Sequence, residues 1–320
     1  HKPESGGHMV TKARPERRRQ TKRQIKKQNA DKVWSQKILS KVKYAIENNL
    51  PLPWQKPWDG KATAHQNAFT KHVYTGVNPF LIDIMGGMVY EDYRWLTYGQ
   101  GKKAGASLKS GQYESGIDLY KPRIIKTEDE AEDGTVEIKN KLIGYSSFTV
   151  WNVEQWDNLD IEPLEPETNT DFDPIAEAEH VIKGIENLPQ IRHDGGDRAF
   201  YSPATDMIHM PKRDLNTFHS TEEYYSTLFH EIAHSTGHES RLNVDTVVDS
   251  DHRKGKGYGT EELRAELTNM MVSRRLGING TYDNSIAYLK SWYKAIEQDE
   301  KLFMRASLKA VKATKYIMGE

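Results

Sequence analysis

The feature that most constrains this chain is a His-Glu-x-x-His pattern made by His230, Glu231 and His234. Residues four apart lie on one face of an α-helix, about one turn from each other, so the two imidazoles can bind one small cation. Glu231 lies beside them, where its carboxylate can reach a water on the same metal. Apolar or small residues flank the pattern, as a buried active-site helix requires. The pattern predicts a metallohydrolase helix, although a surface helix with two idle histidines has the same spacing.

A third ligand is needed, and the sequence excludes one arrangement and offers another. Metzincins place a third histidine six residues after the second, but that position is Ser240. A second expected helix, with Gly259 and Thr260 as its N-cap, carries Glu262 and Glu266 on one face. One carboxylate would bind the metal and the other would orient a ligand histidine. Gluzincins use this order in their Glu-x-x-x-Asp helix, which favours Glu262 as the ligand, and the reverse order stays open.

Composition limits the classes to which this chain can belong. Its 320 residues are enough for two domains that each bury a core. The absence of cysteine excludes disulfides, thiolate zinc sites and cysteine nucleophiles, so any zinc must be held by nitrogen and oxygen. No apolar run approaches the length of a membrane span, and no signal peptide precedes the basic start. We therefore expect an intracellular, cytoplasmic protein that does not enter a membrane.

Charge is distributed unevenly along the chain. Residues 1–9 are interpreted as a cloning remnant, with the natural start at Met9. Residues 10–32 carry ten Lys or Arg and two acids, whereas residues 33–320 sum to −9. A basic arm, residues 10–30, on a mildly acidic body suits an anionic polymer. A disordered solubilising tail has the same composition and stays an alternative.

The pattern along the chain favours an α+β fold with two domains. Residues 31–156 begin with helical periodicity and continue as hairpins, with strands expected near Ile117 to Lys126 and Lys141 to Val153. Residues 157–173 are rich in acids and prolines and are expected to form a linker. Residues 174–320 place a pair of short strands before the histidine helix and then continue as helices, so the second domain is expected to be mainly helical.

Aromatic and basic residues of the first domain suggest contact with single-stranded nucleic acid, because bases stack on exposed rings and phosphates attract cations. Trp54 and Trp58 flank a lysine in a proline-stiffened segment, although either ring could instead pack over the first helix. The residues expected to contact DNA are the aromatic Trp54, Trp58, Trp95 and Tyr98 and the basic Lys102, Lys103 and Lys109.

Collinear blocks of the chain resemble a known family. Phe69 to Phe80, Arg94 to Gln100, Ser107 to Gln112 and Phe148 to Gln155 resemble the N-terminal single-stranded-DNA-binding domain of the ArdC antirestriction family, which also occurs in TraC-type plasmid primases. Ala199 to Pro211, the histidine helix with residues 236–242, and the helix from Glu261 resemble the zincin-like metallopeptidase domain of that family. The basic arm and the acidic run from Glu128 to Glu137 depart from the family pattern.

The resemblance implies an antirestriction protein of a mobile element or phage, with single-stranded DNA as a partner and a host restriction component as a candidate protein substrate. One divalent metal, zinc or alternatively manganese, would be held by His230, His234 and Glu262. Glu231 would act as the general base, and Tyr258 or His238 would stabilise the oxyanion. For His238, a helix-end histidine bonded to a backbone carbonyl is an equal alternative.

Two other functions compete with this interpretation. The protein could protect DNA by coating it, in which case the metal would serve only the stability of the C-terminal domain. It could also be a metal-dependent nuclease. The nuclease is disfavoured because His-Glu-x-x-His supplies one metal and a proton carrier, whereas nucleases usually gather several carboxylates around two metals.

Overall fold

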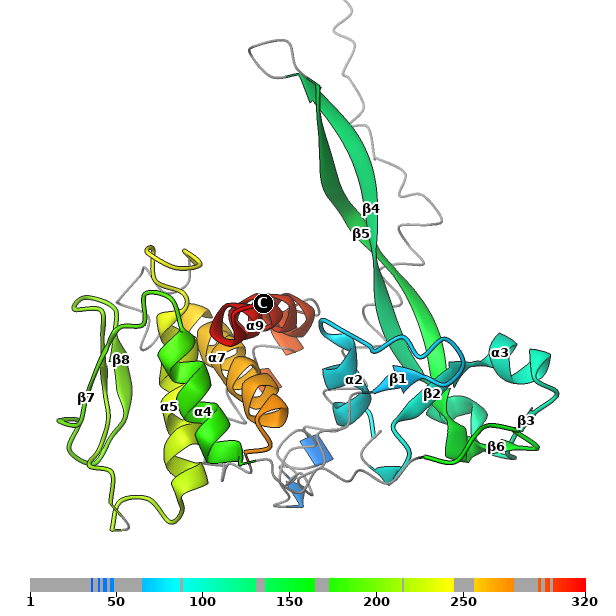
Figure 1. Ribbon diagram of the computed structural model, residues 1–320, viewed down its shortest axis with the longest axis horizontal. Coiled ribbons are helices and arrows are strands. Elements are labelled where there is room, and N and C mark those ends of the chain that lie inside the picture. Colours follow the sequence, from blue (N-terminus) through cyan, green and yellow to red (C-terminus); the bar gives the residue numbers. More distant parts are fainter. Residues whose placement is uncertain are drawn as a thin grey trace, which may run out of the picture.

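The computed structural model describes residues 65–86, 89–130, 136–164, 173–214, 216–244, 256–278 and 302–320, with a few isolated positions between 36 and 48 and between 293 and 299. The basic arm, Trp54 and Trp58, and residues 165–172 of the expected linker lie outside these ranges. Helices and sheets are both present, in two parts that follow each other along the chain, so the predicted α+β class is confirmed (Figure 1). Among the described residues, no helix has both the length and the apolar character that crossing a membrane requires.

The N-terminal part is built on a four-stranded sheet in the order β1-β2-β5-β4. Its strands are β1 (Gln66–Asn67), β2 (Arg94–Thr97), β4 (Ile117–Glu130) and β5 (Val136–Asn152). β1 runs parallel to β2, and the other pairs are antiparallel. Helix α2 (Asn78–Ile84) packs against β4. The predicted pair of strands is therefore present but longer than expected, and its distal half projects from the body as a two-stranded ribbon (Figure 1).

Short elements at one end of this sheet enclose a small core. They are α3 (Tyr98–Lys103), β3 (Ser107–Leu108), η3 (Tyr113–Ser115), η4 (Val153–Gln155) and β6 (Trp156–Asp157). Thr97 and Gln100 form a capping box that starts α3 directly after β2. A Cβ at Gly101 would lie 2.2 Å from the ring of Trp156, so only glycine lets α3 approach this tryptophan.

The C-terminal part places a three-stranded sheet beside helices. The sheet has the order β7-β9-β8, from β7 (Gln190–Arg192), β8 (Phe200–Ser202) and β9 (Met207–His209). The predicted pair of strands before the histidine helix is thus β8 and β9, which are antiparallel. The helices are α4 (Pro174–Gly184), α5 (Thr221–Ser235), α7 (Lys256–Arg275) and α9 (Leu302–Met318). Helix α7 packs against both α5 and α9.

The two parts share a hydrophobic core, which the expectation of two separately packed domains did not include. One cluster of buried side chains contains Leu81 and Trp95 from the N-terminal part and Leu267 and Phe303 from α7 and α9. The linker expected from the sequence therefore connects two parts that are in contact.

A chain of polar contacts crosses the same boundary. The indole N–H of Trp95 bonds Nδ1 of His65 at 3.1 Å, and Nε2 of His65 lies 2.8 Å from the Asp83 carboxylate. The other oxygen of Asp83 forms an ion pair with Arg274 of α7. Asp83 is only 3% exposed, so this pair replaces water as the partner of its charge.

Candidate metal centre

Helix α5 presents the two histidines of the pattern. Ser220 caps the helix by accepting a hydrogen bond from the backbone N–H of Glu223 at 3.1 Å. Leu228 and Ile232 are buried and fix the apolar face of α5 against the core. The rings of His230 and His234 lie on another face, with centroids 4.8 Å apart. The predicted histidine helix is therefore present, one turn of it carrying both imidazoles.

Helix α7 brings Glu262 to the histidine pair. One carboxylate oxygen of Glu262 lies 3.6 Å from Nε2 of His230, and the other lies 3.5 Å from Nε2 of His234. The two Nε2 atoms are 3.2 Å apart. Three potential donor atoms from two helices thus converge on one point. Helix α7 begins at Lys256, so the expected N-cap at Gly259 and Thr260 is wrong. These two residues lie within the helix.

The other ring nitrogen of each histidine faces a different carboxylate. Nδ1 of His230 lies 3.3 Å from Glu266, and Nδ1 of His234 lies 3.2 Å from Glu261. A protonated Nδ1 that donates to a carboxylate leaves Nε2 as the free lone pair, which is the arrangement a metal needs. This geometry favours Glu262 as the ligand and Glu266 as the carboxylate that orients His230. The sequence did not point to Glu261, because helical spacing relates Glu262 to Glu266 and places Glu261 on a neighbouring face of the helix.

Electrostatics show how strongly the site attracts a positive charge. Burial acts to lower the pKa of both histidines, but nearby carboxylates outweigh it. Hydrogen bonds to Glu262 and Glu266 raise the pKa of His230 well above its ordinary value, and the charge of Glu262 raises the pKa of His234 to about 9. Burial also acts to raise the pKa of Glu262, yet the two histidines keep it well below its usual range. The carboxylates therefore favour a positive charge at this centre.

The donor set fits a divalent metal. One donor atom from each of His230, His234 and Glu262 lies within 4.8 Å of the other two, and no other group of this kind occurs in the part of the chain that the structure describes. Two imidazole nitrogens and one carboxylate oxygen match the catalytic type of zinc site, which leaves a fourth position open. Glu231 is 7% exposed, and its charge acts on His230, so its carboxylate also lies close to this centre.

The two predicted oxyanion donors stay predictions. Tyr258 lies on α7, one helical turn before Glu262, although its side chain is outside the described residues. Nδ1 of His238 is 2.8 Å from the hydroxyl of Ser240, in the loop that follows α5. Arg241 of the same loop forms an ion pair with Asp206. These contacts belong to the loop after α5 and do not connect His238 to the metal ligands.

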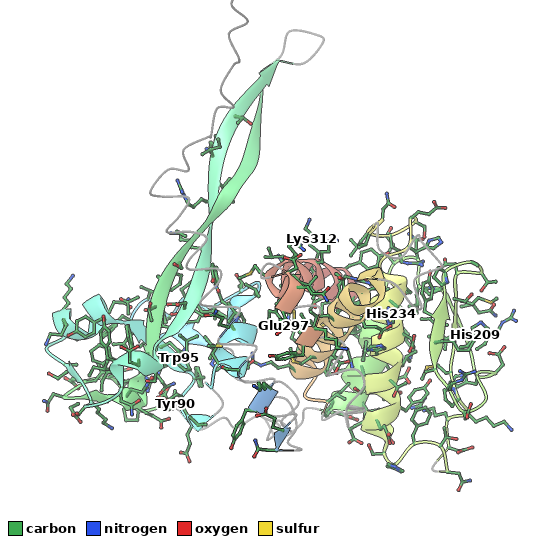
Figure 2. All side chains as sticks on the ribbon, turned by 180° about the vertical axis from the view of Figure 1, so that it is seen from behind. Tyr90, Trp95, His209, His234, Glu297 and Lys312 are labelled. Carbon is green, nitrogen blue, oxygen red and sulfur yellow. The ribbon has the colours of Figure 1, made fainter. Side chains whose placement is uncertain are left out.

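The predicted DNA-contacting residues fall into different environments. Trp95 has no exposed surface and belongs to the buried cluster that includes side chains of both parts, so its ring cannot stack on a base in this structure. Figure 2 shows it in the N-terminal part, near the base of the β4–β5 ribbon. Tyr98 is 43% exposed. Lys102 and Lys103 are exposed in the last turn of α3, whereas the amine of Lys109 donates to the Glu154 carbonyl at 2.8 Å.

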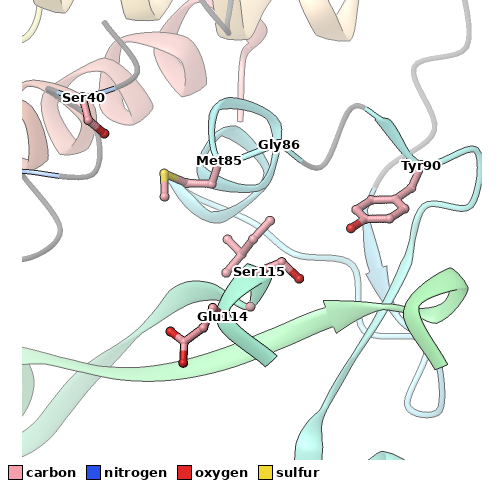
Figure 3. A pocket seen from close by; sticks show the side chains of 8 residues that line it. Ser40, Met85, Gly86, Tyr90, Glu114 and Ser115 are labelled. Atoms are coloured by element: carbon pink, nitrogen blue, oxygen red, sulfur yellow. The ribbon is translucent and has the colours of Figure 1, made fainter. Parts of the chain in front are cut away.

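A pocket of about 360 Å³ lies elsewhere in the N-terminal part, between α2 and η3 (Figure 3). Met85 and Gly86 line it at the end of α2, and Glu114 and Ser115 line it from η3. None of the described residues that line it is a lysine or an arginine, so it lacks the cation that a phosphate prefers. It shares no residue with the metal centre.

Comparisons with known proteins agree with this arrangement. Residues 32–151 match the family described as the N-terminal domain of anti-restriction factor ArdC, and residues 176–309 match the family described as a zincin-like metallopeptidase. The chain is 31% identical to the antirestriction protein ArdC from the R388 plasmid in its metal-free crystal structure, with a TM-score of 0.63 over 90% of this chain and 96% of that one. This chain belongs to the ArdC family of antirestriction proteins.

A second crystal structure of that ArdC protein contains Mn(II), and it matches with the same TM-score of 0.63 over 89% of this chain and 97% of that one. A zincin-like domain implies a divalent metal, and the three ligand candidates can hold one. The predicted family membership and the predicted need for a divalent metal are therefore confirmed.

ArdC-like sequence also occurs within longer proteins. The chain is 34% identical over 285 residues to a DNA primase TraC of Escherichia coli. The aligned region covers 83% of this chain and 18% of the primase. A second TraC primase of the same species is matched over 25% of its length. The chain thus spans a quarter or less of these relatives. It spans 88% of the protein y4eC of Sinorhizobium fredii, to which it is 27% identical.

Proposed function

We propose that this ArdC-family protein binds single-stranded DNA without strong sequence preference and hydrolyses a peptide bond in a protein at its metal centre. The observation that carries the enzymatic half is the convergence of His230, His234 and Glu262 beside Glu231. A protein that only coats DNA would need no more than the three metal ligands. Glu231 adds a buried carboxylate beside these ligands, which a hydrolase needs as its general base. A host restriction component is our candidate for the protein that is cleaved.

The chemistry assigned to this chain centres on Glu231. A divalent metal bound at the centre would supply a Lewis acid that lowers the pKa of a water and polarises the substrate carbonyl. Glu231 then accepts a proton from the attacking water and passes it to the leaving amine. Tyr258, one turn before Glu262, is our candidate donor to the oxyanion. A nuclease is disfavoured, because the described residues contain one candidate group for one metal.

A Glu231→Gln variant tests the enzymatic half. Its metal content should stay at the wild-type level, because Glu231 is not a ligand, whereas hydrolysis should fall by about 10²–10⁴-fold, the usual contribution of a general base. The measurement is protection of an unmodified plasmid from restriction in cells, together with metal analysis of the purified protein. Glu239→Gln removes an exposed carboxylate close to the same helix and serves as the matched control. Full protection by Glu231→Gln would favour the coating function instead.

Exposed rings on the N-terminal part support the DNA-binding half. Tyr98 and Tyr113 are 43% and 64% exposed, and their ring centroids lie 6.1 Å apart. Phe69, 40% exposed, lies in a turn that Asn67 fixes, and the Asn67 amide exchanges hydrogen bonds of 3.0 and 3.1 Å with Gln100 of α3. These rings and the two exposed lysines of α3 are called the aromatic surface below. Its members are Phe69, Tyr98, Lys102, Lys103 and Tyr113.

This surface provides both interactions that non-specific binding of a single strand uses. Rings stack on any base, and lysines attract the phosphates, so neither contact depends on sequence. Tyr113 and Phe69 were not recognised from the sequence, because nothing in their local pattern distinguishes an exposed ring from a packed one. Trp54 and Trp58 stay predictions, since they lie outside the described residues.

A further inference from the structure

We infer that Glu261 and Arg264 act as a positioning pair for the metal centre, in which Arg264 fixes Glu261 so that Glu261 orients His234 and Glu262 is left as the metal ligand. The inference rests on the proposed metal centre and deepens it. Glu261 and Arg264 lie on α7 and meet His234 of α5 only because the two helices pack together, so the pattern of the sequence does not reveal them.

The first step of the argument is the contact of Glu261 with His234. One oxygen of Glu261 lies 3.2 Å from Nδ1 of His234, while Nε2 of the same ring lies 3.5 Å from Glu262. Glu261 therefore contacts the side of the ring opposite to the ligand position. A carboxylate in this place selects the tautomer with the proton on Nδ1, holds the ring plane, and makes Nε2 a stronger donor.

The second step is the state of the Glu261 carboxylate. Nε of Arg264 donates to one oxygen at 2.9 Å, and a terminal nitrogen of the same guanidinium donates to the other oxygen. Such a two-point contact fixes the carboxylate in position and direction. Both oxygens of Glu261 are thus engaged by Arg264, and one of them also faces His234.

The third step is the anchoring of Arg264 on the histidine helix. Its guanidinium donates to the carbonyl of Ala233 at 2.9 Å and to the hydroxyl of Thr236 at 3.0 Å, both at the C-terminal end of α5. Arg264 is 1% exposed. A buried arginine costs free energy unless all its donors are used, and here they connect α7 to the residues next to His234.

Together these contacts explain why two adjacent glutamates have different roles. Glu261 and Glu262 are chemically identical, but only Glu261 is paired with a guanidinium. An arginine-paired carboxylate is a poor metal ligand because its lone pairs are engaged and its charge is already balanced. Glu262 faces both Nε2 atoms and forms no ion pair with an arginine in the part of the chain that the structure describes. The pair therefore orients one ligand and leaves its neighbour to bind the metal.

Cobalt(II) titration of the full-length, chelator-treated protein tests the inference, because cobalt(II) absorption reports affinity and coordination without any substrate. The Glu261→Gln variant should bind cobalt(II) about 10–100-fold more weakly than the wild type, the usual effect of losing a partner of a ligand histidine. The Glu239→Gln control, which removes an exposed charge near the same helix, should bind like the wild type.

The Arg264→Lys variant provides the second measurement, and it decides the result if Glu261→Gln does not fold. Lysine keeps the charge but cannot hold both oxygens of Glu261, so we expect weaker binding and a changed absorption spectrum as the His234 ring loses its fixed orientation. Wild-type affinity and spectrum in the folded variants would overturn the inference while leaving the metal centre intact. No cobalt binding by the wild type would instead contradict the metal centre itself.

Discussion

The metal centre and the aromatic surface are built in opposite ways. Two packed helices supply every group of the metal centre, and Glu262 is 12% exposed in its side chain and paired with both histidines. The aromatic surface combines a turn, the six-residue helix α3 and the short η3, and its aromatic residues are 40–64% exposed. A buried, fully paired site depends on each member, whereas an exposed surface adds its contacts one by one. We therefore expect single substitutions to abolish the function of the first and to weaken the second in steps.

The largest effect is expected at the boundary between the N-terminal and C-terminal parts, which carry the aromatic surface and the metal centre. Asp83→Asn leaves His65 and Arg274 without their buried carboxylate, and breaking such a pair costs roughly 3–5 kcal/mol of folding free energy. Because the two parts share one core, a single unfolding transition should move to lower denaturant for both. Denaturation followed by tryptophan fluorescence and circular dichroism measures this, with the exposed Asp160→Asn as the control. Separate transitions, only one of them shifted, would contradict a shared core.

The affinity of the metal centre should depend on pH. The pKa of His234 is raised to about 9 in the metal-free protein, so at neutral pH the metal must displace a proton. Affinity should therefore rise by about tenfold per pH unit for each proton displaced, from pH 6.5 towards pH 9, and then level off. Calorimetry in buffers of different ionisation enthalpy would detect the released proton. An affinity that is constant over this range would show that the histidines are already neutral.

A smaller effect is expected for the rings of the aromatic surface. Tyr98→Ala and Tyr113→Ala should each weaken binding of a labelled single strand by roughly 1–3 kcal/mol, the usual contribution of one stacked base. Fluorescence anisotropy measures this, and Phe200→Ala, which removes an exposed ring in the C-terminal sheet, is the matched control. If the control weakens binding as much as the two variants do, the strand lies elsewhere.

The smallest effect is expected for the lysines of α3. Lys102→Ala and Lys103→Ala should each lower the slope of log affinity against log salt by about 0.7, the value for one phosphate contact in a single strand. Lys183→Ala, which removes an exposed lysine of α4, should leave the slope unchanged. A slope that the α3 variants leave unchanged would show that these two lysines do not contact the phosphates of the strand.

The same contrast explains what the sequence could predict. His230, His234, Glu262 and Glu266 follow helical spacing, and a helix converts spacing into a common face whatever surrounds it. Glu261 was missed because its partner is on another helix, and only the packing of α5 against α7 brings them together. The helix that carries it also begins at Lys256, one turn before its expected cap.

Residue type was a poor guide where burial decides the role. Trp95 was expected to stack on DNA, yet its ring is fully buried and its indole N–H donates to His65. Tyr113 was not among the residues expected to contact DNA, although it is more exposed than Tyr98, which was. Aromatic residues satisfy either role, and only tertiary contacts choose between them. The long ribbon of β4 and β5 was predicted as a hairpin, but neither its length nor the shared core could be inferred from periodicity.

The measurement that tests the central claim most directly is metal content by elemental analysis of the wild type, Glu262→Ala and Glu239→Gln. We predict one divalent metal per chain in the wild type and in Glu239→Gln, and none in Glu262→Ala, with the three proteins equally folded by circular dichroism. A wild type without metal, or a Glu262→Ala variant that keeps a full equivalent, would contradict the assignment of His230, His234 and Glu262 as a metal centre.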